Sequence, residues 1–398
     1  MDPITALLAE VLDETRPRRE GAPASYIPEL ADADPELLAL AVVGPRGRIR
    51  SVGDEDAEFT IQSISKPFVL ALALAEHGLT EVMKHVGTEP SGEPFNAISL
   101  EKGTGRPANP LINAGAIATT SLIPGADIDE RTGRVVEILS AFAGRSLWVD
   151  EDVYRSESAT GDRNRALGHL LRSHGVLHGP VDLTVETYFR QCSVLVTVRD
   201  LAVMAGTLAF GGVNPATGDR VVSERVARDV ISIMAGCGMY DFSGEWMLRV
   251  GLPAKSGVSG GVLAVAPSQF GVATYSPRLD GHGNSVRGSA IVQTLSERFG
   301  MHLLEPHESI SDPAVRVEST PSGRVIRIGG ELGLAGAERL LALLREFAEK
   351  SPAGAELLVD TSKIARSHPH AIGVLEAELA ALPPGIRFLD DPDEEPAR

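Results

Sequence analysis

The 398-residue chain is 43% hydrophobic, a composition typical of a soluble globular protein with roughly two or three domains. Its 37 Lys and Arg residues against 54 Asp and Glu residues give a formal net charge of -17 at pH 7. This acidic balance argues against nucleic acid and anionic membrane surfaces as partners.

The cysteines and the apolar segments indicate the cellular location of the protein. Cys192 and Cys237 are too few for a disulfide framework, and we interpret both as buried thiols in a reducing compartment. Residues 1–12 have no basic start, and their apolar spacing is that of an amphipathic helix rather than a signal peptide. The longest apolar run, 68–75, is too short to span a bilayer. We therefore predict a cytoplasmic protein.

The first predicted domain covers residues 1–304. Residues 38–43 and 49–52 are expected to form two paired strands across a Gly-Pro-Arg-Gly turn. A helix should begin close to Ser63, because Pro67 lacks an N–H and is tolerated only in a first turn. Further helices are expected over 161–171, 199–208, 223–234 and 285–299, and strand structure over 254–266 and 271–275. Strands at both ends of a helical middle predict an α+β fold.

The second predicted domain, residues 314–390, follows a linker at 305–313 and precedes a disordered tail at 391–398. Strands are expected over 315–318, 325–328, 356–359 and 386–389, with helices over 338–350 and 370–382. This alternation predicts a small α/β domain.

Ser63 and Lys66 are the residues that first indicate a chemistry. They lie three positions apart at the start of an apolar helix, so both side chains share one helical face. A serine hydroxyl needs a base to take its proton, and Lys66 can do so only when it is neutral. Burial beside a second cation, such as Lys255, is expected to lower the pKa of Lys66. The same pattern occurs by chance as a helix cap with a surface lysine.

A Lys-Ser-Gly-Val segment at 255–258 can supply the opposite wall of such a site. The N–H of Ser63 and the N–H of Val258 could stabilise an oxyanion together, and Gly257 would allow the two backbones to approach closely. This pairing of motifs recurs in penicillin-recognising acyl-transfer enzymes. It predicts a mechanism without naming a substrate.

Seven segments carry a recognisable pattern. They are, in order, Tyr-Ile-Pro-Glu-Leu-Ala at 26–31, Gln-Ser-Ile-Ser-Lys-Pro at 62–67, Glu-Pro-Ser-Gly at 89–92, Asn-Pro-Leu-Ile-Asn-Ala-Gly-Ala-Ile at 109–117, Gly-Asp-Arg-Asn at 161–164, Cys-Gly-Met-Tyr-Asp at 237–241 and Gly-Leu-Pro-Ala-Lys-Ser-Gly-Val at 251–258. Together they closely resemble the serine-dependent glutaminase family, whose members have a β-lactamase-like fold. The resemblance covers roughly residues 20–300 and implies that fold for the first domain.

The resemblance also implies a role for each matched residue. Ser63 would be the nucleophile, Lys66 its base and Tyr240 a proton relay, with the N–H groups of Ser63 and Val258 as the oxyanion hole. The implied substrate contacts are Tyr26, Gln62, Ser63, Asn113, Glu157, Asn164, Tyr188, Tyr240 and Val258, supported by Lys255, Ser256 and Gly257.

The chemistry of glutamine agrees with these contacts, because its ammonium needs an anion such as Glu157 and its carboxylate needs amide or hydroxyl donors. Without the family, the tyrosines would be core aromatics, the asparagines helix caps and Glu157 a solvated acid. The polarity of residues 158–160 is lower than is common in the family, which could shift affinity.

The resemblance therefore predicts a glutaminase that hydrolyses L-glutamine to L-glutamate and ammonia through a glutamyl-serine, without metal or organic cofactor. It also implies a homodimer or homotetramer. Two alternatives remain open at this point. One is a penicillin-interactive enzyme, disfavoured by the absence of an evident signal peptide and Ser-Asp-Asn motif. The other is a glutamine-sensing protein that does not turn its ligand over.

The second domain more loosely resembles a STAS domain, through segments 358–364 and 371–375. Pro369 and His370 occupy the positions where a phosphorylatable serine would stand, so we expect a partner-binding or oligomer-supporting module rather than a phospho-switch. His368 and His370 are close in the sequence but lack further partners at the spacing of a metal site.

Overall fold

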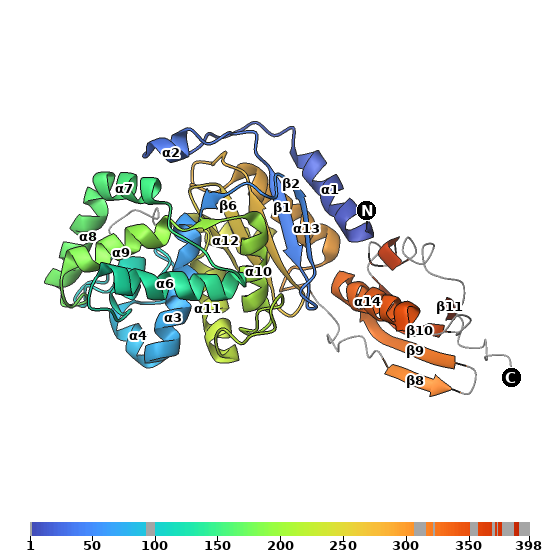
Figure 1. The fold of residues 1–398 in the computed structure, drawn as a ribbon. Coiled ribbons are helices and arrows are strands. Elements are labelled where there is room, and N and C mark those ends of the chain that lie inside the picture. Colours follow the sequence, from blue (N-terminus) through green and yellow to red (C-terminus); the bar gives the residue numbers. More distant parts are fainter. Residues whose placement is uncertain are drawn as a thin grey trace. The chain divides into compact units, whose positions relative to one another are not determined.

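The computed structural model describes two units of the chain (Figure 1). The described residues are 2–92, 100–305, 316–320, 323–350, 357–367, 371, 373–375 and 386–389. Contacts divide the chain into Leu8–Thr294 on one side and Met1–Leu7 with Leu295–Arg398 on the other. Each unit contains a separate sheet.

The larger unit is built on a five-stranded antiparallel sheet in the order β2-β1-β7-β6-β5. The strands are β1 (Ala39–Val43), β2 (Ile49–Gly53), β5 (Ala254–Ser256), β6 (Gly261–Ala266) and β7 (Phe270–Tyr275). The predicted pairing of residues 38–43 with 49–52 is confirmed, and β1 also pairs with β7 from the far end of the unit. All residues of β1, β5, β6 and β7 are buried, as expected when helices cover both faces of a sheet.

Small residues allow helices to lie close against this sheet. A side chain at Gly271 of β7 would place its Cβ 2.2 Å from the backbone nitrogen of Gly206, in α10 (Val198–Ala209). A Cβ at Gly288, in α13 (Val286–Phe299), would lie 2.6 Å from Oγ1 of Thr274, which is also in β7. Because Gly271 and Thr274 lie an odd number of positions apart, α10 and α13 contact opposite faces of the sheet.

A helical region completes this unit (Figure 1). Its helices are α2 (Pro28–Ala31), α3 (Lys66–His77), α4 (Leu79–His85), α5 (Asn113–Ser121), α6 (Ile128–Ala143), α7 (Glu151–Thr160), α8 (Asp162–Ser173), α9 (Val181–Cys192), α11 (Glu224–Cys237) and α12 (Ser243–Arg249), while α1 (Pro3–Thr15) begins the chain. The predicted helices at 161–171, 199–208, 223–234 and 285–299 are confirmed as α8, α10, α11 and α13.

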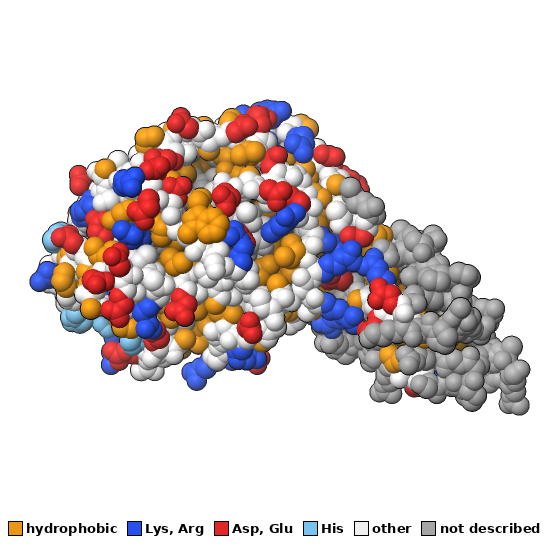
Figure 2. Space-filling view, in the orientation of Figure 1, with side chains coloured by type: hydrophobic (Ala, Val, Ile, Leu, Met, Phe, Trp, Pro, Cys, Tyr) orange, Lys and Arg blue, Asp and Glu red, His pale blue; other side chains and the backbone are white. Residues whose placement is uncertain are grey.

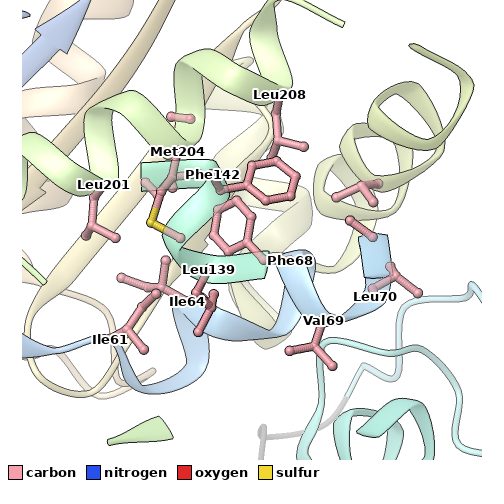
Figure 3. Packing of buried hydrophobic residues seen from close by; sticks show 14 of the residues in the cluster. Ile61, Ile64, Phe68, Val69, Leu70, Leu139, Phe142, Leu201, Met204 and Leu208 are labelled. Atoms are coloured by element: carbon pink, nitrogen blue, oxygen red, sulfur yellow. The ribbon is translucent and has the colours of Figure 1, made fainter. Parts of the chain in front are cut away.

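Helix α3 is the centre of the apolar core, as its sequence predicted. Phe68 of α3 lies against Phe142 of α6 with ring centroids 4.8 Å apart. Figure 3 shows the two rings beside Met204 and Leu208 of α10, so α6 and α10 both pack against the first turns of α3. This packing fixes the end of α3 at which Lys66 lies.

Two boundaries differ from the sequence prediction. The α-helix begins at Lys66, and Ser63 lies one turn earlier in a short 3₁₀-helix, η1 (Gln62–Ser65). Pro67 still occupies the first turn of α3, where its missing N–H leaves no bond unmade. The strand structure expected over 254–266 is divided by a tight turn at 257–260 into β5 and β6, which pair with each other.

The smaller unit contains a four-stranded mixed sheet in the order β11-β10-β9-β8, formed by β8 (Arg316–Thr320), β9 (Gly323–Leu332), β10 (Leu357–Ser367) and β11 (Ile386–Leu389). Helix α14 (Leu334–Lys350) follows β9, which agrees with the predicted α/β alternation. The prediction that the third strand ends at residue 359 is wrong, because β10 follows β9 through two register shifts to Ser367. Residues 306–313 of the predicted linker, most of the helix expected at 370–382 and the tail lie outside the described residues.

The described part of the chain contains no helix long and apolar enough to cross a membrane. Within the same residues, no cluster of three or more His, Cys, Asp or Glu side chains could hold a metal ion, and both cysteines are buried and free. Figure 2 shows acidic and basic side chains interspersed over the displayed face of the larger unit.

The close approach of α10 to β7 predicts opposite effects for two glycine substitutions. Gly271→Ala should lower the free energy of unfolding by about 1–3 kcal/mol, because its Cβ overlaps the α10 backbone. Gly133→Ala, in α6 with open space around it, should raise this free energy by up to about 1 kcal/mol. Urea unfolding followed by tryptophan fluorescence reports this unit alone, because both tryptophans, Trp148 and Trp246, lie in it. Equal effects of the two substitutions would contradict this account of the packing.

Candidate active site

The turn before α3 brings Ser63 and Lys66 into a largely buried position. Ser63 is 7% exposed and Lys66 is 1% exposed. The preceding residue, Gln62, has a φ of 49°, a left-handed conformation that residues with side chains rarely adopt. The backbone therefore enters α3 through a constrained turn that carries the serine.

Lys66 is held by the start of α5 rather than by Ser63. Its Nζ donates to Oδ1 of Asn113 at 2.7 Å and to the carbonyl of Leu111 at 3.4 Å. Burial lowers the pKa of Lys66 to about 8, since a charged amine is poorly solvated there. A neutral fraction of roughly one tenth is then present at neutral pH, which is enough for a general base.

The expected lowering of the Lys66 pKa is confirmed, but its cause is the burial of Lys66 rather than the charge of Lys255. Burial lowers the pKa of Lys255 well below its usual value, and the charge of Lys66 lowers it further. The coupling between the two amines therefore acts on the pKa of Lys255, while burial accounts for the lowered pKa of Lys66.

Tyr240 links Ser63 to the strand that carries Lys255. Its phenol is hydrogen-bonded to Ser63 and donates to the carbonyl of Ser256 at 3.1 Å. Nζ of Lys255 donates to the same carbonyl at 2.7 Å and lies 3.9 Å from the centroid of the Tyr240 ring. Burial raises the pKa of Tyr240 to about 12, and hydrogen bonds with the side chains of Ser63 and Ser256 oppose this shift. Tyr240 is therefore protonated at neutral pH and can donate a proton.

A second group of predicted residues surrounds the carboxylate of Glu157, on the inner side of α7. Oε1 of Glu157 accepts from the Tyr26 hydroxyl at 2.8 Å and from Nε2 of Gln62 at 3.2 Å. Burial raises the pKa of Glu157, and these two donors oppose the rise. Tyr26 is 48% exposed, so this anion lies behind a partly open residue.

The predicted amide pair also meets in space. Nδ2 of Asn113 donates to Oδ1 of Asn164 at 3.2 Å, which joins the first turn of α5 to the first turn of α8. Tyr188 of α9 is buried, and Nζ of Lys66 lies 6.0 Å from its ring centroid. The amides and the lysine thus form one connected group.

Gly257 and Val258 lie where the opposite wall was expected. A Cβ at Gly257 would be 3.1 Å from the carbonyl of Ile61, so the glycine permits close approach to the η1 turn. The side chain of Val258 belongs to an apolar cluster with Ile27 near Tyr26 and Val153 of α7. Val258 therefore joins the Lys255 strand to the Glu157 side of the site.

Sequence reasoning missed a chain of buried polar residues behind the serine: Ser65, Gln191 and Thr120. It also missed Asn284, which accepts from the Ser256 hydroxyl at 2.5 Å. One signal was available, since Gln191 lies three positions after Tyr188 and shares its helical face. Nothing in the sequence indicates the partners of Gln191.

The geometry joins a buried hydroxyl, an amine that can be neutral and a protonated phenol at one point. A carboxylate that can bind an ammonium group lies beyond Gln62, and amide groups surround the lysine. This combination suits acyl transfer from a small zwitterionic amide.

Comparisons with known proteins point to one family. The glutaminase family model matches residues 21–304. A glutaminase from Corynebacterium glutamicum is 44% identical over 98% of this chain and 95% of its own length. A glutaminase from Clavibacter michiganensis is 54% identical over 69% of this chain and 85% of its own length.

Solved structures agree with this assignment. The structure of Mglu in its glutamate form matches over 99% of both chains, with 40% identity and a TM-score of 0.76. A probable glutaminase, ybaS, matches 76% of this chain and 98% of its own, with 40% identity and a TM-score of 0.74. The chain belongs to the glutaminase family.

Proposed function

We propose that this protein hydrolyses the side-chain amide of L-glutamine to L-glutamate and ammonia, through a glutamyl ester on Ser63. Its membership of the glutaminase family supports the activity. The observation that carries the mechanism is the hydrogen bond of Ser63 to Tyr240, one turn from a lysine whose pKa burial lowers to about 8.

The substrate would lie between Glu157 and Ser63. Glu157 would bind the α-ammonium, since its carboxylate is already oriented by the donors Tyr26 and Gln62. The amides of Asn113 and Asn164, with nearby tyrosine hydroxyls, would bind the α-carboxylate. The side-chain carboxamide then extends towards Ser63.

In the first step, Oγ of Ser63 attacks the carboxamide carbon and passes its proton to neutral Lys66. The resulting oxyanion would be stabilised by the N–H groups of Ser63 and Val258. The C–N bond breaks as the nitrogen receives a proton from Lys66, directly or through Tyr240, and ammonia leaves. Water, activated by the same groups, attacks the glutamyl ester, releases glutamate and restores Ser63.

The alternatives are less well supported. A penicillin-interactive enzyme would share the nucleophile, but the family that matches most of the chain is that of glutaminases. A glutamine sensor without turnover would not need the connected Ser63, Lys66 and Tyr240 groups.

Further parts of this proposal concern the rest of the chain. We infer a β-lactamase-like catalytic domain at residues 1–304 and a STAS-like module at 314–390. The module would bind a partner or support a homodimer or homotetramer. The mixed sheet β8–β11 with α14 supports a separate α/β module. The two free buried cysteines support a cytoplasmic location.

Ser63→Ala should reduce ammonia release from L-glutamine by at least about a thousandfold, because the acyl ester can no longer form. The binding of L-glutamate, measured by calorimetry, should change by less than about threefold, because Glu157 and the amides remain. The unchanged melting temperature serves as the control for folding. Equal rates for the wild type and Ser63→Ala would contradict the mechanism.

The rate should depend on pH through Lys66. Because the neutral amine is the active form and its pKa is lowered to about 8, kcat/KM should rise about tenfold per pH unit below pH 8 and level off above it. Tyr240→Phe should be slower with the same midpoint. A profile still rising at about pH 10 would assign the base to another group, such as Tyr240.

Glu157→Gln should raise the KM for glutamine by about tenfold or more, because the buried partner of the α-ammonium loses its charge. The matched control is Glu151→Gln in the same helix, where the carboxylate is half-exposed and paired with Arg190. Steady-state kinetics should leave the KM of the control within about twofold of the wild type. Equal KM changes in both variants would remove Glu157 from the binding site.

A further inference from the structure

Ser65, two residues after the proposed nucleophile, has a fully buried hydroxyl that the mechanism does not use. Its Oγ donates to the carbonyl of Gln62 at 2.7 Å and accepts from Nε2 of Gln191 at 3.0 Å. Ser65 is 0% exposed and Gln191 is 1% exposed. Because Ser65 is inaccessible and already hydrogen-bonded in both directions, its place in the motif is not that of a second nucleophile.

The hydrogen bonds of Ser65 extend to two other helices. Oε1 of Gln191, in α9, accepts from Oγ1 of Thr120, in α5, at 3.0 Å, and Thr120 is completely buried. A serine that bonds to a carbonyl three residues earlier is common in helices. The continuation through Gln191 to Thr120 is what distinguishes Ser65, since it ties the η1 turn to α9 and α5.

The acceptor of this chain, the carbonyl of Gln62, belongs to the peptide unit that contains the N–H of Ser63. A trans peptide is planar, so its C=O and N–H point in opposite directions. The bond from Ser65 fixes the direction in which the carbonyl points and thereby directs the Ser63 N–H the opposite way. Gln62 has a φ of 49°, a conformation that persists only where its surroundings hold it.

We propose that Ser65, held by Gln191 and Thr120, is a positioning residue that fixes the Gln62–Ser63 peptide plane and so aims the Ser63 N–H at the oxyanion. This inference rests on the proposed role of Ser63. It assigns Ser65 an effect on the step that develops charge, and none on the binding of the substrate amine and carboxylate.

Ser65→Ala should therefore lower kcat for glutamine about 10- to 100-fold, within the loss that follows removal of one oxyanion donor. The KM for glutamine and the Kd for L-glutamate should stay within about threefold, since Glu157 and Asn113 are untouched. The matched control is Ser193→Ala. It removes another fully buried hydroxyl, which donates to the carbonyl of Phe189 in α9. Its kcat should stay within about twofold of the wild type.

A second pair of variants tests the chain at its far end, where the change is nearly isosteric. Thr120→Val removes the donor to Gln191 and should lower kcat about 3- to 10-fold. Thr119→Val removes a neighbouring buried hydroxyl that bonds only to the carbonyl of Gly115 in its own helix, and should leave kcat within about twofold. The double variant Ser65→Ala/Thr120→Val should be no slower than Ser65→Ala, because both substitutions act through the same chain of hydrogen bonds, which ends at the carbonyl of Gln62.

The proposal is overturned if Ser65→Ala retains kcat within about twofold, if both threonine variants lose equal activity, or if the double variant shows additive losses. Each is measured on the full chain by ammonia release, with melting temperature recorded alongside. A parallel assay of Ser63→Ala distinguishes failure of the positioning role from failure of the serine mechanism. An inactive Ser63→Ala with a fully active Ser65→Ala would reject only the positioning role, whereas an active Ser63→Ala would reject the serine mechanism itself.

Discussion

The burial of Lys66 is the constraint on which the rest of the catalytic unit depends. A lysine that is almost inaccessible to water keeps a pKa near 8 only while water stays out of its surroundings. The start of a helix, with its positive dipole end, disfavours the charged amine further. Phe68, two residues later, closes the apolar side through its contact with Phe142. The core packing of α3 is therefore part of the chemistry, because a loosened helix would admit water and return Lys66 to its charged form.

The arrangement of the second lysine follows from the first. Two ammonium groups in one dry region repel each other, and the pKa of the more deeply affected Lys255 falls well below its usual value. Nζ of Lys255 donates to the carbonyl of Ser256, which also accepts from Tyr240. The phenol is thus oriented by a carbonyl that it shares with Lys255, and burial raises its pKa to about 12. At neutral pH roughly one phenol in 100,000 is ionised, against roughly one Lys66 in ten that is neutral, which favours Lys66 as the proposed base.

The sequence predicted which of these residues lie together better than it predicted their interactions. The Ser63 and Lys66 spacing, the apolar run after Pro67 and the glycine before Val258 depend on local rules, and the structure places these residues together. The partners of Gln191 lie 71 and 126 positions away in the sequence, and only the packing of α9 against both η1 and α5 brings them together. The direction of the coupling between the lysines also could not be predicted, since it depends on which amine is buried more unfavourably.

Backbone strain occurs at both ends of the hydrogen-bonded path through Ser63. In the described part of the chain, Gln62 and Tyr240 have left-handed backbone conformations, with φ of 49° and 59°. Each begins a short 3₁₀-helix, and each has a carbonyl that accepts from a buried serine three residues later, Ser65 or Ser243. Such conformations cost about 1–3 kcal/mol each and persist where other contacts hold them. The proposed nucleophile Ser63 and its phenol partner Tyr240 are therefore held by the same local arrangement, which fixes their separation before substrate binds.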